Sequence, residues 1–133
     1  MNNTAFNTAA QYRQLNVQTS VASASPHQLI EMLFDGVRDR LNQAIGSVER
    51  GDIATRSNSI NSAVEIISGL QASLDFEQGG EIAANLEALY DYMQRRLFRA
   101  NVDNDIAGLV EVADLVDTIR AAWSAIAPTD QDA

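Results

Sequence analysis

The one histidine of this chain is the first residue whose chemistry has to be weighed. His27 follows Pro26 in the first turn of a predicted helix, and the chain has no cysteine, so a disulfide or a thiolate metal site is excluded. Histidine phosphotransfer domains are helical bundles with one reactive histidine, which makes phosphotransfer an alternative from a different functional class. Such a histidine is expected midway along an exposed helix flank. The position of His27 beside Pro26 disfavours that activity.

Carboxylates and glycines are the other residues that could build a reactive site. Asp35 and Asp39 lie one helical turn apart, but they flank Arg38 and lie off the apolar stripe, which is typical of a solvated helix face. A di-iron bundle needs two Glu-x-x-His pairs, and one histidine cannot supply them. Gly79-Gly80 is too short for a phosphate-binding loop and lacks a downstream Lys-Ser/Thr. We predict no catalytic residue, no metal site and no cofactor, and therefore no enzyme.

The charge of the chain disfavours two classes of partner. The formal net charge is −9, and all nine basic residues are arginines. A field of that sign repels nucleic-acid phosphates and anionic lipids. The densest basic cluster, Arg95, Arg96 and Arg99, is offset by nearby aspartates, so we interpret it as a solvated helix face. We predict no nucleic-acid partner.

Targeting signals are missing from the sequence. The first residues lack the basic region and apolar core of a secretory signal. No apolar run approaches the ~20 residues that a membrane span needs. We therefore expect a cytoplasmic protein that does not insert into a membrane.

The first predicted helix has clear start and stop signals. Ser25 suits the N-cap position, Pro26 suits the first helical position, and Gln28 can complete a capping box. Gly51 ends the helix. Between these signals apolar residues recur at the helical period, at Ile30, Phe34, Val37, Leu41, Ala44 or Ile45, and Val48.

Three further helices follow by the same criteria. Asp52 is the predicted cap of the second, and Gly79-Gly80 its predicted end; the third begins near Glu81. Asp103 or Asn104 caps the fourth, and Pro128 ends it. The predicted core stripes are Ile53, Ile60, Val64, Ile67 and Leu74; then Ile82, Leu86, Leu89, Tyr90, Met93 and Leu97; then Leu109, Val112, Val116, Ile119 and Trp123.

The predicted fold is all-α, an antiparallel up-down four-helix bundle over residues 25–128. Long helices joined by short connections pack as antiparallel neighbours. Residues 1–24 are predicted to form a partly flexible cap segment, with a short helix around residues 4–15. Residues 129–133 are predicted to form a disordered acidic tail.

Each predicted helix also carries an apolar residue off its core stripe. At about 100° per residue, these residues are Met32, Ile66, Phe98 and Val110. One on each helix indicates grooves that can hold further amphipathic helices. Met32 or Ile66 can alternatively pack under the N-terminal segment, and the two interpretations are compatible. We therefore predict a protein-binding surface that includes these four residues.

Several sequence motifs, in order and with matching spacing, closely resemble the FliS family of flagellar secretion chaperones. The resemblance runs from about Tyr12 to Pro128. The motifs are Ala24 to Gly36 (ASPHQLIEMLFDG), Leu74-Asp75, Gly79 to Leu86 (GGEIAANL), Leu89 to Met93 (LYDYM), Ala100-Asn101 and Ala122-Trp123.

This resemblance implies a function. Family members are cytosolic helical bundles that bind the disordered C-terminal region of flagellin, prevent its premature polymerisation and assist its delivery to the type III export gate. The implied partners are thus flagellin and an export-gate component, for a monomer or weak homodimer. The family's N-terminal segment can occupy part of the flagellin site, and its tyrosine corresponds to Tyr12. Ala9 departs from the larger apolar residue of some relatives, which puts the strength of this cap in doubt.

Two alternatives to a flagellin chaperone stay open. The bundle could be a scaffold for another amphipathic partner, or for a second copy of itself, through the same grooves. The phosphotransfer module at His27 is the alternative from another class.

Overall fold

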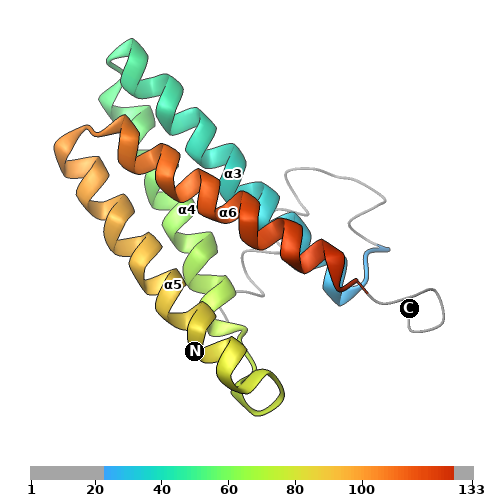
Figure 1. Cartoon of the computed structure of the whole chain (residues 1–133). Helices are drawn as coiled ribbons and strands as arrows, with labels where there is room; N and C mark the ends of the chain where they lie inside the picture. Colours follow the sequence, from blue (N-terminus) through green and yellow to red (C-terminus); the bar gives the residue numbers. More distant parts are fainter. Residues whose placement is uncertain (1–22, 128–133) are drawn as a thin grey trace.

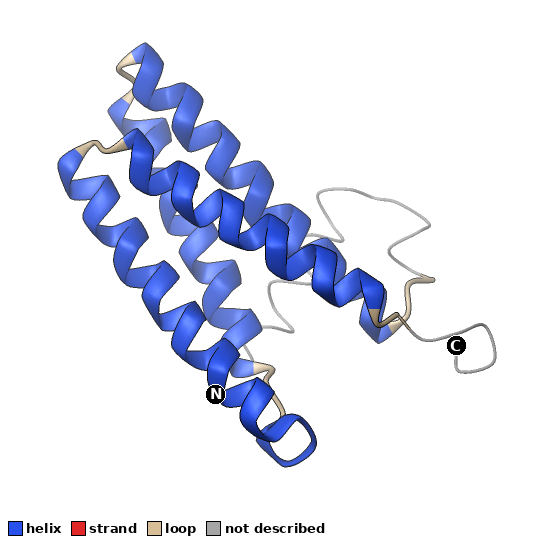
Figure 2. Ribbon diagram, viewed as in Figure 1, coloured by secondary structure: helices blue, strands red, loops and turns tan. Residues whose placement is uncertain are grey.

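Four helices follow one another in residues 23–127, the part of the chain that the computed structural model describes. They are α3 (Pro26–Arg50), α4 (Ile53–Ala72), α5 (Phe76–Asp103) and α6 (Ile106–Ala125). Within this part no strand is formed (Figure 2). Short turns reverse the chain between successive helices (Figure 1), and α6 returns to pack on α3 as well as on α5. The predicted antiparallel four-helix bundle is confirmed.

The predicted caps of the first two helices are confirmed. The Ser25 hydroxyl accepts from the Gln28 amide N–H at 3.1 Å, and the Gln28 side chain accepts from the Ser25 amide N–H at 2.9 Å. Gly51 ends α3 with φ of 74°, a left-handed conformation that glycine adopts without strain. Asp52 accepts from the Thr55 amide N–H at 3.1 Å and caps α4.

The predicted boundary between the second and third helices is wrong. Helix α4 ends at Ala72, and α5 begins at Phe76, because the Asp75 carboxylate accepts from two free N–H groups of the next turn. Gly80 has φ of 49° and ψ of −121°, so it bends α5 after its first turn. The glycine pair therefore bends the third helix and does not end the second.

The predicted cap of the fourth helix is also wrong. Asn104 has φ of 54° and ends α5, while Asp105 accepts from the Ala107 amide N–H at 3.0 Å and caps α6. Asp103 still belongs to α5. Two polar residues are needed because one helix must be ended and the next begun within a two-residue turn.

The core forms along the centre of the bundle from all four helices. Its best-buried large side chains include Phe34, Val37, Leu41, Ile60, Ile67, Leu70, Met93, Leu97, Leu109, Val112 and Val116. Most predicted stripe residues belong to this core or pack against it. Ile53 and Ile82 are exceptions, because they lie in the first turn of α4 and just after the bend of α5, and 65% and 70% of their surfaces are exposed. Leu89 is a third exception, since it is half-buried and outside the core cluster.

Ile66 is a further correction, because it was predicted to lie outside the core and is only 4% exposed. The hydroxyl of Ser62 accepts from Arg40 of α3, and Ser59 donates to Gln43 of α3. Ile66 lies four residues after Ser62 and seven after Ser59, so it faces α3. A stripe drawn through large apolar residues omits Ser59 and Ala63, the small buried residues that complete this face.

Several predictions fall outside the described residues. They are the cap segment and short helix expected within residues 1–22, including Tyr12 and Ala9, and the segment 128–133 with Pro128. These stay predictions. The last described helix ends at Ala125.

Candidate partner-binding surface

The most exposed aromatic side chain in the described bundle lies where α5 meets α4. Gln94 donates to Gln71 of α4 at 2.9 Å, and Asn101 accepts from Arg56 of α4 at 2.9 Å. Phe98 lies four residues after Gln94 and three before Asn101, so it belongs to the same edge of α5. Phe98 nevertheless exposes 69% of its surface, and Val102, one turn further on, exposes 67%. We call Phe98 and Val102 the α4–α5 edge.

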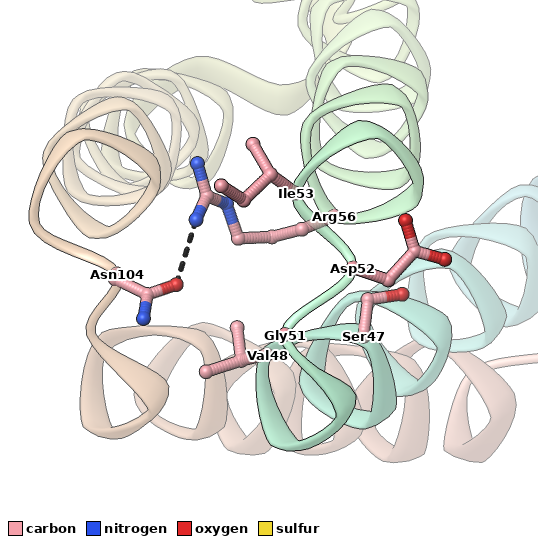
Figure 3. Close-up of a pocket in the computed structure, with 7 residues that line it drawn as sticks. All are labelled: Ser47, Val48, Gly51, Asp52, Ile53, Arg56 and Asn104. Atoms are coloured by element: carbon pink, nitrogen blue, oxygen red, sulfur yellow. Dashed lines mark hydrogen bonds between the residues drawn. The ribbon is translucent and has the colours of Figure 1, made fainter.

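A shallow cavity lies at the nearby end of the bundle, where the α3–α4 turn meets the α5–α6 turn. Its volume is about 320 Å³. Figure 3 shows Ile53 and Arg56 beside Asn104, whose side-chain oxygen accepts from Arg56 at 2.7 Å. The other lining residues are Ser47, Val48, Gly51 and Asp52. The exposed Ile53 side chain therefore has apolar Val48 and a cationic group around it.

The seam between α3 and α6 carries the other two predicted groove residues. Val110 lies two helical turns before Asp117, which pairs with Arg38 of α3 at 3.2 Å, so Val110 lies on the α3 side of α6. Its exposed fraction is 40%. Met32 is half-buried and lines a second cavity, of about 290 Å³, with Ser23, Gln28, Glu31, Asp35 and Arg120. We call Met32 and Val110 the α3–α6 edge.

The α3–α6 edge is bordered by charged and aromatic contacts. Asp35 accepts from two nitrogens of Arg120, at 2.8 and 3.3 Å. Asp35 is thus not half of a paired-carboxylate site. The His27 and Trp123 rings stack with centroids 4.3 Å apart. Each also bonds the other's backbone carbonyl, at 2.8 Å from His27 Nε2 and 2.9 Å from Trp123 Nε1.

This contact defines the role of His27. A carbonyl oxygen only accepts hydrogen bonds, so Nε2 of His27 donates and carries the proton. The side chain is only 10% exposed, and one ring face lies against Trp123. A phosphoryl donor needs an open imidazole nitrogen. His27 therefore fastens the start of α3 to the end of α6, and the geometry disfavours phosphotransfer through Nε2.

A charged cluster joins α5 to α6. Arg96 donates to Glu111 at 2.9 Å and to Asp105 at 3.2 Å, and Tyr92 donates to Glu111. The hydrogen bond from Tyr92, followed by that from Arg96, lowers the pKa of the Glu111 carboxyl. The bond from Arg96 lowers the pKa of Asp105, and Glu111 raises the pKa of Tyr92. The lowered pKa values favour the charged carboxylates, and the raised pKa of Tyr92 favours the neutral phenol that donates to Glu111.

The structure separates the five predicted site residues. Phe98 is on the α4–α5 edge; Met32 and Val110 are on the α3–α6 edge, across the bundle. Ile66 is in the core, and Tyr12 lies outside the described residues. Our sequence analysis missed Val102, although its spacing of four residues from Phe98 was a usable signal. It also missed the exposure of Ile53, because exposure at a helix end depends on which neighbours cover that end.

Residues 23–127 contain no group of three or more histidine, aspartate and glutamate side chains placed to hold a metal ion. In the same part of the chain, none of the helices is apolar over a length that would cross a membrane. The described bundle exposes apolar side chains along these two edges and also near the helix ends, at Ile53, Phe76, Ile82 and Ile126. An all-helical bundle with such a surface has the form of a helical binding protein.

Comparison with known proteins identifies the family. The chain belongs to the FliS family, because the family model for flagellar protein FliS matches residues 8–130. The flagellar secretion chaperone FliS of Salmonella typhimurium is 50% identical over 118 residues, covering 88% of this chain and 87% of the relative. FliSB of Pseudomonas aeruginosa is 43% identical over 116 residues, covering 87% and 92%.

More distant relatives carry the same name. The flagellar secretion chaperone FliS of Bacillus subtilis is 36% identical over 106 residues, covering 80% of this chain and 78% of the relative. The resemblance found in the sequence motifs is confirmed. The relatives are named chaperones, so the family's role is not enzymatic.

Proposed function

We propose that this chain is a flagellar secretion chaperone that binds the C-terminal region of flagellin along the exposed apolar edges of the bundle. It acts in the cytosol as a monomer or weak homodimer. It prevents premature polymerisation of flagellin and assists delivery to the type III export gate. Membership of the FliS family supports the flagellar role. The resemblance described under the sequence motifs is the reason for proposing flagellin as the client and the type III export gate as its destination.

The observation that carries the binding mode is the exposure of Phe98 beside a neighbouring helix. Phe98 and Val102 are one turn apart on α5 and are more than two-thirds exposed. Gln94 donates to Gln71 of α4 and Asn101 accepts from Arg56 of α4, and these bonds hold the two helices side by side at this edge. An amphipathic client helix that lies along the edge can bury both side chains, as in helix-in-groove recognition.

The energetics suit a client that must later be released unfolded. Ordering a disordered segment costs about 2–5 kcal/mol, and burial of about 1,000–3,000 Å² offsets it. Affinity is then spread over a large area of modest contacts. Met32 and Val110 offer a second apolar edge across the bundle, so a long client segment can contact both edges. The segment with Tyr12 would compete for part of this surface, as the resemblance implies.

The test is binding of a flagellin C-terminal segment to the full chain, measured by size-exclusion chromatography and titration. Phe98→Ser removes the most exposed aromatic of the α4–α5 edge. Ile126→Ser is the matched control, because Ile126 is 67% exposed but lies just beyond the end of α6. Both variants should keep the helical circular dichroism and melting temperature of the wild type.

We expect Phe98→Ser to weaken the complex about tenfold or more, as loss of a buried aromatic contact does. The Ile126→Ser control should stay within twofold of the wild type. A wild-type chain that forms no complex with the segment would refute the proposed function. Equal weakening by both variants would show that the client does not use the α4–α5 edge.

The rival binding function is a scaffold for another amphipathic protein or for a second copy of the chain. Capture of flagellin from a cell extract containing other helical proteins separates this rival from the proposal. The phosphotransfer alternative is tested by adding a phosphodonor and assaying acid-labile phosphate on His27. Because the His27 ring is stacked on Trp123 and hydrogen-bonded to its carbonyl, we expect no phosphate on His27.

A further inference from the structure

The outer face of α5 carries a line of exposed residues with the spacing of a coiled coil. Figure 1 shows α5 along one side of the bundle, and these residues all follow its bend at Gly80. They are four, three, four, three and four residues apart, the alternation that lets two helices pack along a common seam. Tyr90, Met93 and Leu97 lie on the opposite side of α5, in the core. We call the exposed line the α5 seam: Ala84, Ala88, Asp91, Arg95, Phe98 and Val102.

The two central residues of the α5 seam carry opposite charges. Asp91 accepts from the Gln71 side-chain amide at 2.9 Å, and so its hydrogen-bond partner is uncharged. Within residues 23–127 neither Asp91 nor Arg95 forms an ion pair, although three other arginines there do. The seam therefore has no excess of either charge. A surface that complements it must itself carry one acidic and one basic group, in the reverse order.

The apolar residues of the α5 seam differ in size between its two ends. Ala84 and Ala88 lie at the N-terminal end, and Phe98 and Val102 lie at the C-terminal end. The two large side chains are 69% and 67% exposed. Facing helices interdigitate best when large residues lie opposite small ones. The matching surface therefore has large apolar residues where this seam has alanines, and alanines where this seam has large residues.

A second copy of the α5 seam, running antiparallel, meets both requirements. In a two-fold symmetric antiparallel pair, the first residue of one seam lies opposite the last residue of the other, and so on inward. Phe98 and Val102 then face the two alanines of the other copy. Arg95 faces the other copy's Asp91, and symmetry forms this ion pair twice. In a parallel pair each residue would face its own copy, so that Arg95 would face Arg95, which like-charge repulsion disfavours.

We propose that two copies of this chain pair antiparallel along the α5 seam, and that this pairing covers Phe98 and Val102 until the export client replaces the second copy. The seam is about 27 Å long and offers six residues a copy, fewer than the roughly 20–30 of a stable interface. Each copy also has a net charge of −9, so the copies repel each other at long range. The dimer is therefore weak, as a form that a client displaces must be. The displacement rests on the proposed function; the pairing does not.

The test measures self-association of the full chain by sedimentation equilibrium, from about 10 µM to about 1 mM, the range of weak association. Asp91→Arg and Arg95→Asp each place like charges at both central contacts. An equimolar mixture of the two variants restores opposite charges at both contacts. The matched control is Asp39→Arg, which changes an exposed aspartate of α3, a helix that packs on α4 and α6. Circular dichroism confirms that each variant is folded.

We expect the wild type to dimerise as its concentration rises, and each of the two seam variants to associate about tenfold more weakly or less. The mixture should associate as the wild type does. Asp39→Arg should associate at least as strongly as the wild type, because it lowers the net negative charge. Asp91→Arg lowers that charge equally, so its loss of association would come from the seam. The double variant Asp91→Arg/Arg95→Asp exchanges the two charges and should pair with itself. Adding the flagellin C-terminal segment should convert the wild-type dimer into a complex with one copy of the chain.

Four results would overturn the inference. A wild type that stays monomeric at about 1 mM has no such pairing. Seam variants that associate like the wild type would place the contact on another face. A mixture and a double variant that both fail to associate would show that residues 91 and 95 do not face each other. A flagellin segment bound to an intact dimer would show that pairing leaves the client's residues uncovered. The proposed function survives each of these if the wild type binds the segment, whereas a wild type that dimerises but binds no segment would remove the proposed function and keep the pairing.

Discussion

The α3–α6 edge and the α4–α5 edge lie on opposite sides of one bundle and are built with different chemistry. Across the α3–α6 edge, Arg120 pairs with Asp35, Arg38 pairs with Asp117, and His27 clasps Trp123. Across the α4–α5 edge no ion pair forms within the described residues; the side-chain hydrogen bonds each use an amide, as in Gln94 with Gln71, Gln71 with Asp91, and Arg56 with Asn101. The large exposed side chains Phe98 and Val102 belong to this second edge.

The difference shows how one edge of the bundle can hold two helices together while the opposite edge keeps an apolar surface for binding a client. Charged and aromatic contacts hold α6 against α3, where both ends of the described chain meet. The amide-linked edge leaves its apolar side chains to solvent, where a client can cover them. One partner in each hydrogen bond named at the α4–α5 edge is an uncharged amide, and no ion pair joins these helices within the described residues, so apolar groups can lie beside them at a lower cost in desolvation than beside a pair of charges. Four predictions test this comparison.

The largest difference in unfolding free energy is expected between alanine variants of two adjacent residues of α5. Leu97 is fully buried and Phe98 is mostly exposed. Leu97→Ala should lower the free energy of unfolding by about 2–5 kcal/mol, because it opens a cavity in the core. Phe98→Ala should change it by less than about 0.5 kcal/mol. Urea unfolding followed by circular dichroism measures both, and similar losses would mean that the α4–α5 edge is part of the core.

A smaller loss of stability is expected when the contact between His27 and Trp123, beside the α3–α6 edge, is weakened. Trp123→Phe keeps an aromatic ring against His27 but removes the indole N–H that donates to the His27 carbonyl. We expect a loss of about 1 kcal/mol in unfolding free energy, typical of one hydrogen bond. Amide hydrogen exchange should quicken in the first turn of α3 and the last turn of α6. If exchange quickens at the α4–α5 turn instead, the contact between His27 and Trp123 does not hold the start of α3 against the end of α6.

The ion pair on the same edge should contribute less, and its contribution should depend on salt. Asp35→Asn breaks the pairing with Arg120, and both side chains are more than a third exposed. We expect a loss of about 0.5–1 kcal/mol at low salt, falling towards zero in 0.5 M sodium chloride (about 4 Å screening length). Asp39→Asn is the control, since Asp39 forms no ion pair within the described residues. A loss that does not change with salt would show that packing, not charge, joins these helices.

The smallest effect is expected at the amide contacts of the α4–α5 edge. Gln71→Ala removes the bonds to Gln94 and Asp91 on α5. Since these groups are solvated when unpaired, we expect a loss of about 0.5 kcal/mol. Most of this loss should persist in high salt, unlike that of Asp35→Asn. If Gln71→Ala proves the more salt-sensitive variant, the chemical contrast between the two edges is wrong.

Local signals in the sequence determined the number and order of the described helices. Ser25, Gly51 and Asp52 act on N–H and C=O groups within a few residues, so their roles were visible without knowing the fold. The apolar period placed Phe34, Leu41 and Leu97 in the core for the same reason. The sequence motifs also predicted the family. The bend at Gly80 and the cap at Asp105 were missed, because several nearby residues fit these positions almost equally well.

The tertiary structure alone decided which face of each helix is covered. Ile66 and Phe98 were both off-stripe in the sequence, yet Ile66 faces α3 in the core and Phe98 faces solvent. Burial depends on where neighbouring helices lie, and a single helix's periodicity does not contain that information. The pairing of His27 with Trp123, 96 residues apart, was equally hidden. Such contacts exist only after packing brings the two ends of the bundle together.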